Sequence, residues 1–305
     1  MMSMVTKLLM IRPCCFGYDD QTASNNRFQR QKEGEDVQSV ALEEFDGMVS
    51  MLRDHGIPVL VVEDTPEPLT PDSIFPNNWF STHNDGTLVL YPMFAPNRRE
   101  ERRPEIIQAV KDAAGTTRVI DLTEWEDRGE FLESTGSMVL DRKSRIAYSC
   151  RSPRTSEKVL DEFCREMGYR AVLFDAVDRD GSPIYHTNVM MSIGDGYAVV
   201  CKDVITSPEE LAMVERSLTA SGKEIIDISY DQMLDYACNI LQVHDTEGKS
   251  LIVMSETARA SLNAAQLAAL NEKGAILAAR IPQIEEVGGG SARCMMAEVL
   301  CRESS

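Results

Sequence analysis

Apolar residues follow two spacings along the chain. Short apolar runs, such as residues 59–62 and 171–174, have the length of buried β-strands. Longer segments, such as residues 37–55 and 208–220, repeat apolar side chains every three or four positions, as amphipathic helices do. Turn residues such as Gly194-Asp195-Gly196 separate neighbouring strand candidates and predict hairpins. The chain is therefore expected to be an α/β protein built from short elements.

The order of the predicted elements repeats along the chain. Each unit contains a strand, a second strand that completes a hairpin, a helix and a closing strand, over about fifty to sixty residues. In one unit these elements occupy residues 137–140, 146–150, 156–167 and 171–174. Four units are clear, and the two ends of the chain are expected to complete a fifth. A closed ring of such units would bring the start of every hairpin to one central channel.

Residues 17–35 do not fit this repeat. They are polar and poor in aliphatic side chains, which predicts a long surface loop. Loops of this length are commonly functional, for example as covers of an active site. Whether this segment forms a lid is left open by the sequence.

Composition and charge exclude several classes of function. The chain has 49 acidic and 31 basic residues and a net charge of −18, which disfavours binding to nucleic acid. It contains no apolar run of transmembrane length, and the apolar core of its N-terminus is too short for a signal peptide. The eight cysteines are irregularly spaced, which favours reduced thiols in a cytoplasmic protein over disulfides or a zinc site. We therefore expect no metal, no cofactor and no membrane partner.

Polar stretches with reactive side chains stand at the start of successive units. Glu133 belongs to the second unit, His186 to the third and Cys294 to the last, where it follows three glycines, residues 288–290. Such glycines would let the backbone approach a ligand closely. Each residue alone is typical of a structural role, but a ring would bring the thiol, the imidazole and the carboxylate together. These three groups are the ones that nucleophilic catalysis by a cysteine uses.

Six sequence motifs together resemble one protein superfamily. They are PDSIFPNNWFSTH (71–83), NRREERR (97–103), FLESTGSMVLDR (131–142), SPRT (152–155), HTNVM (186–190) and GGGSARC (288–294). Over nearly its whole length the chain resembles the pentein, or guanidine-modifying, superfamily, and most of all its citrulline-utilisation hydrolases. The resemblance implies a five-bladed α/β propeller of ββαβ units around a central active site, with residues 1–305 as a single catalytic domain.

The resemblance also implies roles for the three reactive residues. Cys294 would attack the planar carbon of a guanidino or ureido group and form a covalent adduct. His186 would protonate the leaving amine and then activate water against the adduct. Glu133 would accept a hydrogen bond from His186 and favour the charged imidazole.

Three charged residues match substrate-binding positions of the superfamily. Arg98 and Arg154 would hold a substrate carboxylate, a task that suits the guanidinium fork. Asp72 would bind the substrate amino group. The partner implied by these roles is a small amino acid.

Asparagines replace the carboxylates that surround the substrate head in guanidine-using relatives. They are Asn77, Asn78 and Asn188. Burying a cationic guanidinium without a counter-charge is costly, whereas a neutral ureido group pairs with amide donors and acceptors. We therefore expect these asparagines to bind a ureido substrate, and the hypothesis is hydrolysis of citrulline to ornithine, ammonia and carbon dioxide.

Two alternatives remain open at this point. One is an arginine deiminase, dihydrolase or amidinotransferase-type enzyme that acts on a guanidino compound. The other, from a different functional class, is a non-catalytic binding protein with the same fold. The order of product release and the oligomeric state, homo-oligomers included, are also undetermined by the sequence.

Overall fold

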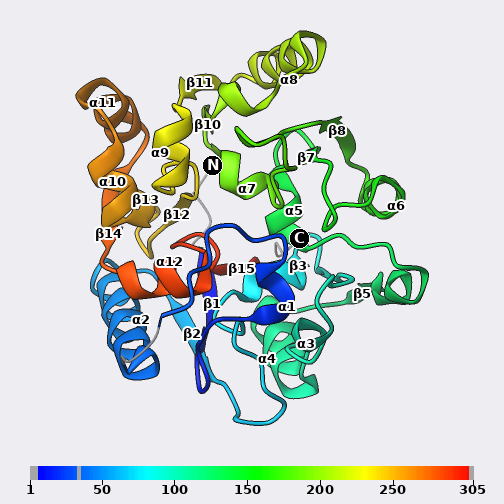
Figure 1. Ribbon diagram of the computed structural model, residues 1–305, viewed down its shortest axis with the longest axis vertical. Helices are drawn as coiled ribbons and strands as arrows, with labels where there is room; N and C mark the ends of the chain where they lie inside the picture. Colours follow the sequence, from blue (N-terminus) through cyan, green and yellow to red (C-terminus); the bar gives the residue numbers. More distant parts are fainter. Residues whose placement is uncertain (1–5, 33–35, 302–305) are drawn as a thin grey trace.

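Five three-stranded sheets surround a central axis in the computed structural model, which describes residues 6–32 and 36–301 (Figure 1). The strands, grouped by sheet, are β15 (Ala297–Val299), β1 (Lys7–Arg12) and β2 (Val59–Glu63); β3 (Phe80–Thr82), β4 (Thr87–Leu90) and β5 (Arg118–Asp121); β6 (Val139–Asp141), β7 (Ile146–Cys150) and β8 (Arg170–Phe174); β9 (Met191–Gly194), β10 (Tyr197–Val200) and β11 (Glu224–Asp227); β12 (Leu241–His244), β13 (Ser250–Ser255) and β14 (Ala275–Ala279).

Every sheet has the same pairing pattern. The middle strand pairs antiparallel with one neighbour and parallel with the other, as β7 does with β6 and β8. In the first sheet the antiparallel partner of β1 is β15, with Leu9 opposite Ala297, and the parallel partner is β2. The two ends of the chain therefore complete the fifth unit, as predicted from the repeat.

Helices connect the strands; the longer ones lie outside the sheets in Figure 1, and several short ones lie near the centre of the ring. The α-helices are α1 (Asp20–Ala23), α2 (Val37–Asp54), α3 (Pro96–Arg99), α4 (Pro104–Ala114), α5 (Ser134–Ser137), α6 (Glu157–Met167), α7 (Thr187–Met190), α8 (Pro208–Ala220), α9 (Tyr230–Leu234), α10 (Glu256–Ser261), α11 (Ala264–Lys273) and α12 (Pro282–Gly288). Short 3-10 helices are η1 (Pro76–Asn78), η2 (Thr123–Arg128) and η3 (Lys202–Val204).

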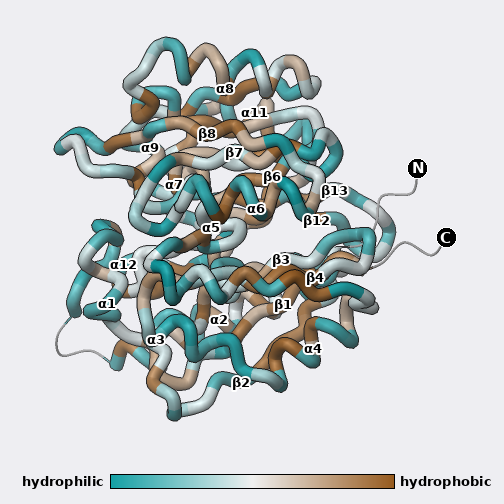
Figure 2. The backbone as a smooth tube through the Cα atoms, turned by 90° about the vertical axis from the view of Figure 1, so that its right-hand side faces the viewer, coloured by the Kyte–Doolittle hydropathy of each residue, from teal (hydrophilic) through white to brown (hydrophobic). Residues whose placement is uncertain are grey.

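Amphipathic helices cover the sheets through their apolar faces. In α6, for example, Val159, Leu160 and Phe163 are fully buried, and the helix ends at Gly168, whose φ of 67° is a left-handed conformation that favours glycine. Figure 2 shows hydrophobic segments running through the interior along strands such as β4 and β8. None of the helices in the described ranges is long and apolar enough to cross a membrane.

Two segments that the sequence predicts to be single helices, residues 98–113 and 256–270, are interrupted in the structure. The first is two helices, α3 and α4, because Pro104 cannot continue a helix and instead occupies the first position of α4. The segment over 256–270 is likewise divided into α10 and α11. Asn263 caps the second of these helices in a capping box with Gln266.

Residues 17–32, which we call the strap, differ from the predicted surface loop. They contain α1, and the side chains of Thr22, Asn26 and Gln29 are buried. Gln29 hydrogen-bonds to the Gly288 carbonyl oxygen at 3.1 Å, so the strap packs on the glycine loop before Cys294. The polar composition therefore reflects contacts with other polar groups inside the protein. The remainder of the predicted loop, residues 33–35, lies outside the described residues.

Candidate active site

The candidate site lies where the first turns of neighbouring blades meet. The sequence predicts that the hairpin strands begin at residues 137 and 189, but single helical turns, α5 and α7, precede those strands. Gly136 in α5 allows these turns to approach closely. A Cβ atom at Gly136 would lie 2.5 Å from Asn78 Nδ2 and 2.8 Å from His186 Cε1, closer than atoms can pack. Asn78 and His186 therefore face the same small space.

His186 and Glu133 form a buried pair. The imidazole Nε2 lies 2.7 Å from Glu133 Oε2, and the other carboxylate oxygen accepts the Phe94 backbone N–H at 3.0 Å. Arg154 Nη1 also donates to Glu133 Oε2 at 3.3 Å. Burial alone would raise the pKa of Glu133, but the charge of Arg154 and the hydrogen bond from His186 hold that pKa well below its usual range. Glu133 is therefore a carboxylate at neutral pH.

Burial has the opposite consequence for His186. It lowers the pKa of the imidazole to about 4. Glu133 raises this pKa and Arg154 lowers it, but the effect of burial is the largest. Glu133 therefore favours the charged imidazole, whereas desolvation by burial opposes it with the larger effect. Since Glu133 engages Nε2, proton transfer to a ligand would use Nδ1.

Cys294 ends the glycine loop that follows α12. Its side chain is 6% exposed, and its sulfur lies 3.7 Å from Asn188 Nδ2 and 3.3 Å from Asn239 Nδ2. The glycines have neighbours other than a ligand. A Cβ atom at Gly288 would lie 2.8 Å from the Phe75 ring, and one at Gly289 would lie 2.6 Å from the Gln29 backbone nitrogen. Packing against Phe75 and the strap therefore explains two of these glycines.

The buried amides of Asn77, Asn78 and Asn188, which we call the amide cluster, each keep one polar atom unused. Asn77 Nδ2 donates to Thr135, Asn78 Oδ1 accepts from Arg98 at 2.7 Å, and Asn188 Nδ2 points at the sulfur of Cys294. Arg98, which only donates, orients the Asn78 amide, and Thr135, whose hydroxyl hydrogen is given to the Asn77 backbone carbonyl oxygen, orients the Asn77 amide. In the part of the chain that the structure describes, Asn77 Oδ1, Asn78 Nδ2 and Asn188 Oδ1 have no hydrogen-bond partner. The cluster therefore offers one donor and two acceptors.

Asp72, Arg98 and Arg154, which we call the charged cluster, are buried but fully engaged. Arg98 binds both oxygens of Glu101, at 2.8 and 3.0 Å, as well as Asn78 and two backbone carbonyls. The sequence did not suggest Glu101 as a partner, although its position three residues after Arg98 in α3 and the following turn would permit it. Arg98 thus holds Asn78 in place.

Strap atoms occupy the other two members of the charged cluster. Thr22 Oγ1 donates to Asp72 at 2.8 Å, and Gln29 Nε2 lies 3.3 Å from both Asp72 oxygens. Burial raises the pKa of Asp72 to about 6, although Arg98 opposes the shift. Arg154 donates to the Asn25 amide oxygen and to the Thr22 carbonyl oxygen, the latter at 3.0 Å.

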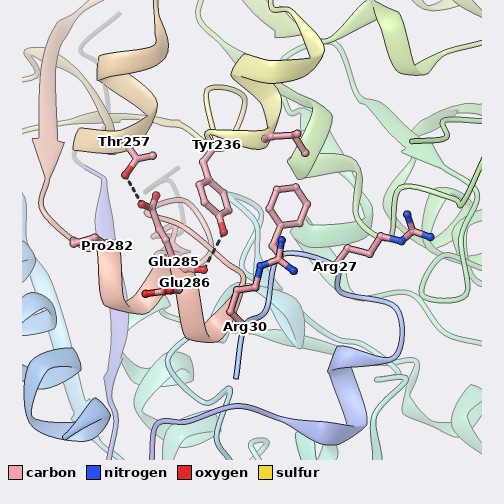
Figure 3. A pocket seen from close by; sticks show the side chains of 9 residues that line it. Arg27, Arg30, Tyr236, Thr257, Pro282, Glu285 and Glu286 are labelled. Carbon is pink, nitrogen blue, oxygen red and sulfur yellow. Dashed lines mark hydrogen bonds between the residues drawn. The ribbon is translucent and has the colours of Figure 1, made fainter. Parts of the chain in front are cut away.

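A cavity of about 420 Å³ lies beside the strap (Figure 3). Arg27, Phe28 and Arg30 of the strap line it together with Tyr236 and Glu285, but Cys294 and His186 do not. The Phe28 ring, which lines the cavity, packs on Tyr236 at 5.2 Å between ring centres and on Tyr185 at 6.3 Å. Tyr185 in turn packs on His186 at 4.7 Å.

All nine sequence-predicted site residues are buried, and hydrogen bonds join Glu133 to His186 and Arg154, and Asn78 to Arg98. Cys294 contacts Asn188 and also Asn239, which the sequence reasoning missed. Asn239 precedes β12 at the start of the fourth blade, the one unit for which no polar motif stood out. The repeat itself was the available signal, because Asn77, Asn78 and Asn188 occupy corresponding places in other blades. The described residues contain no group of three or more side chains arranged to bind a metal ion.

Comparison with protein families gives a match over almost the whole chain. A family model described as "N,N dimethylarginine dimethylhydrolase, eukaryotic" matches residues 12–301. Comparison with curated protein sequences gives no match.

Comparison with solved structures gives matches of the same fold. The N-terminal domain of ArgZ bound to product, an arginine dihydrolase from the ornithine–ammonia cycle in cyanobacteria, is 17% identical with a TM-score of 0.76, and the match covers 98% of this chain and 99% of that one. AgrE in a ternary complex with ornithine and NAD+ is 16% identical with a TM-score of 0.76, over 99% of this chain and 40% of that one. A dimethylarginine dimethylaminohydrolase adduct with 4-chloro-2-hydroxymethylpyridine is 14% identical with a TM-score of 0.66, over 97% and 100%.

Proposed function

The chain belongs to the N,N dimethylarginine dimethylhydrolase family of the pentein superfamily, and from this membership we propose that it is a cysteine-dependent hydrolase whose preferred substrate is citrulline. The coarser part of this statement, a pentein hydrolase of the guanidino-modifying type, follows from the family. The cysteine mechanism and the choice of citrulline rest on the geometry of the site.

Cys294 is the proposed nucleophile. Its thiolate attacks the ureido carbon, and a sulfur–carbon bond forms while one carbon–nitrogen bond breaks. His186 first takes up a proton at Nδ1 from solvent, to which the Cys294 thiol has released one, and then passes it to the departing amine, while Glu133 accepts the Nε2–H at 2.7 Å. Water then cleaves the sulfur–carbon bond, and the carbamic acid formed releases carbon dioxide. In total, citrulline and one water give ornithine, ammonia and carbon dioxide.

The amide cluster is the observation that carries the choice of substrate. A ureido group has one carbonyl acceptor and N–H donors, which match the unused Asn78 donor and the unused Asn77 and Asn188 acceptors. A guanidinium has only donors, so it would leave Asn78 Nδ2 unsatisfied. An unsatisfied buried donor costs about 1–3 kcal/mol. The guanidinium charge would also face amides where a carboxylate would compensate it.

The charged cluster supports an amino-acid substrate. We propose that Asp72 receives the α-ammonium and Arg154 the α-carboxylate when the strap atoms of Thr22, Asn25 and Gln29 move away. Both groups already bind neutral atoms of matching polarity, which a ligand can replace. The carboxylate-binding role predicted for Arg98 has weaker support, because Glu101 and Asn78 already engage its guanidinium.

An arginine-type substrate is the second candidate. It is favoured by the family description, which names dimethylarginine, and by the likeness to ArgZ, which is an arginine dihydrolase. A dihydrolase would convert arginine and two waters to ornithine, two ammonia and carbon dioxide.

The test is incubation of the purified protein with citrulline, arginine or N,N-dimethylarginine in separate reactions, with ornithine, ammonia and dimethylamine quantified. We expect one ornithine and one ammonia for each citrulline consumed. Turnover of either guanidino compound without turnover of citrulline would contradict the proposal. Cys294→Ala should abolish product formation, whereas the matched control Cys301→Ala, at an exposed cysteine, should not.

A further inference from the structure

Asn239 lies against the reacting sulfur and has no role in the proposed reaction so far. It is 2% exposed and sits directly before Ile240 and β12 in the fourth blade. Its Nδ2 is 3.3 Å from Cys294 Sγ, closer than the 3.7 Å of Asn188 Nδ2. The question is what this amide does for the sulfur.

Two backbone hydrogen bonds determine which way the Asn239 amide points. Its Oδ1 accepts the Arg293 backbone N–H at 3.1 Å, and its Nδ2 donates to the Asn188 carbonyl oxygen at 3.2 Å. Because a backbone N–H only donates and a carbonyl only accepts, the reversed amide would lose both bonds. The second N–H of Nδ2 is therefore presented to Cys294 Sγ at 3.3 Å, while Oδ1, which the thiol can donate to, lies at 3.6 Å.

Other groups around the sulfur supply little positive charge. Tyr185, Tyr236 and Arg293 are titratable groups that interact electrostatically with Cys294. Burial raises the pKa of both tyrosines, so they are neutral. The Arg293 guanidinium is directed to the Met296 carbonyl oxygen at 2.7 Å and to Glu298 at 3.3 Å.

His186 does not supply a positive charge either. Burial lowers its pKa to about 4, so the imidazole is neutral at neutral pH. Because Arg293, the neighbouring cation, is already engaged by Met296 and Glu298, a thiolate here also depends on hydrogen-bond donors.

We propose that Asn239 is a catalytic residue that stabilises the ionised form of Cys294 by donating its Nδ2 hydrogen to the sulfur. Ionisation releases the thiol proton to solvent, and the amide N–H then compensates the charge left on sulfur. When the sulfur–carbon bond forms, the charge leaves the sulfur and the contact weakens. The proposal rests on Cys294 as the proposed nucleophile, but ionisation of the thiol can be followed without any substrate.

The test is the pH profile of alkylation by iodoacetamide, with Cys294 identified by peptide mass spectrometry. Asn239→Asp keeps an acceptor for the Arg293 N–H but removes the donor to sulfur, and Asn239→Ala removes both. We expect the midpoint of the Cys294 profile to rise by about one pH unit in each variant, which is about tenfold less thiolate below the midpoint. The larger rise belongs to Asn239→Asp, which adds a negative charge.

Asn26→Ala is the matched control. Asn26 is a buried amide that reaches the Gly288 and Gly289 carbonyl oxygens of the same loop, at 3.4 and 3.3 Å. Its midpoint should equal that of the original protein. An unchanged midpoint in Asn239→Asp, or an equal rise in Asn26→Ala, would overturn the proposal. Either result is separate from the substrate assays, which test the proposed function itself.

Discussion

In the amide cluster, Asn77, Asn78 and Asn188 each leave one buried polar atom without a partner in the described ranges, whereas in the charged cluster every side chain is bound by several groups. The first cluster contains no charge, and the second contains three. Buried charges are normally paired, since an unpaired one is very costly. Unsatisfied amides cost less, about 1–3 kcal/mol each, and folding can tolerate them where a ligand will bind.

This difference separates two recognition tasks. In the amide cluster, Arg98 and Thr135 fix the orientation of Asn78 and Asn77, so these two amides can present their unused atoms without rearrangement. The charged cluster must exchange partners, because strap atoms now occupy Asp72 and Arg154. We infer that the amides determine which head group is accepted, while the strap affects how readily any amino acid enters.

The largest effect is expected from a change that disturbs the His186–Glu133 pair and the charged cluster together. Glu133→Gln removes the carboxylate that binds both His186 and Arg154. We expect kcat to fall by about a hundredfold to ten-thousandfold, as when the residue orienting a catalytic histidine is lost. Steady-state kinetics check this, with Glu130→Gln, a carboxylate outside the site, as the control. Similar kcat values for the two variants would contradict the role of Glu133.

A single amide tests the selectivity of the amide cluster. Asn78→Asp removes the unused donor and keeps an acceptor for Arg98. Without the donor for the ureido oxygen, kcat/KM for citrulline should fall by about ten- to a hundredfold. Any arginine activity should fall less or rise. Asn263→Asp is the control, because position 263 is a helix N-cap and both asparagine and aspartate are favourable there. Equal losses of kcat/KM for citrulline and arginine would show that Asn78 does not distinguish the ureido from the guanidino head group.

A smaller effect is expected in the strap. Asn25→Ala removes an acceptor from Arg154 without removing a charge. Since the substrate carboxylate then displaces one bond fewer, KM for citrulline should fall by a few-fold while kcat changes little. Ser24→Ala, at the adjacent exposed position, is the control. A rise in KM would instead indicate that Asn25 helps to bind the substrate.

The smallest effect concerns stability and pH. The folded-state pKa of His186, about 4, lies below the ordinary 6.5. Between these pH values the unfolded chain binds a proton at His186 and the folded chain does not. The contribution of His186 to stability is therefore lost as the pH falls from about 6.5 towards 4. Asp72, with a pKa raised to about 6, acts in the opposite direction. Its contribution cancels when the original protein is compared with His186→Gln.

Denaturant unfolding at pH 7 and pH 5 measures this contribution. Acidification should destabilise the original protein more than His186→Gln. Parallel losses in the two proteins would mean that His186 is not buried in its neutral form.

Much of the fold could be predicted from the sequence because the spacing of the hydrophobic residues follows the repeat. The hairpins, the helices and the closing of the ring by the two ends follow from local patterns. The convergence of Glu133, His186 and Cys294 followed from their places in the repeat. The breaks before α4 and α11 were missed, although Pro104 and Asn263 were visible signals.

Contacts between segments that are distant in the sequence could not be predicted from local patterns. The contact of Asn239 with Cys294 joins two blades. The burial of Thr22 and Gln29 depends on Asp72, which compensates their polarity inside the protein. The neutral state of His186 depends on how completely the strap and Tyr185 exclude water, a property of the assembled site.

Competition between citrulline and arginine in one reaction tests the selectivity of the amide cluster most directly. The purified protein is given equal concentrations of both, and the loss of each is followed by mass spectrometry. If the amides of Asn77, Asn78 and Asn188 select a neutral ureido group, citrulline is consumed at least about a hundred times faster than arginine, since two unmatched groups cost about 3 kcal/mol. Faster consumption of arginine would contradict that selection.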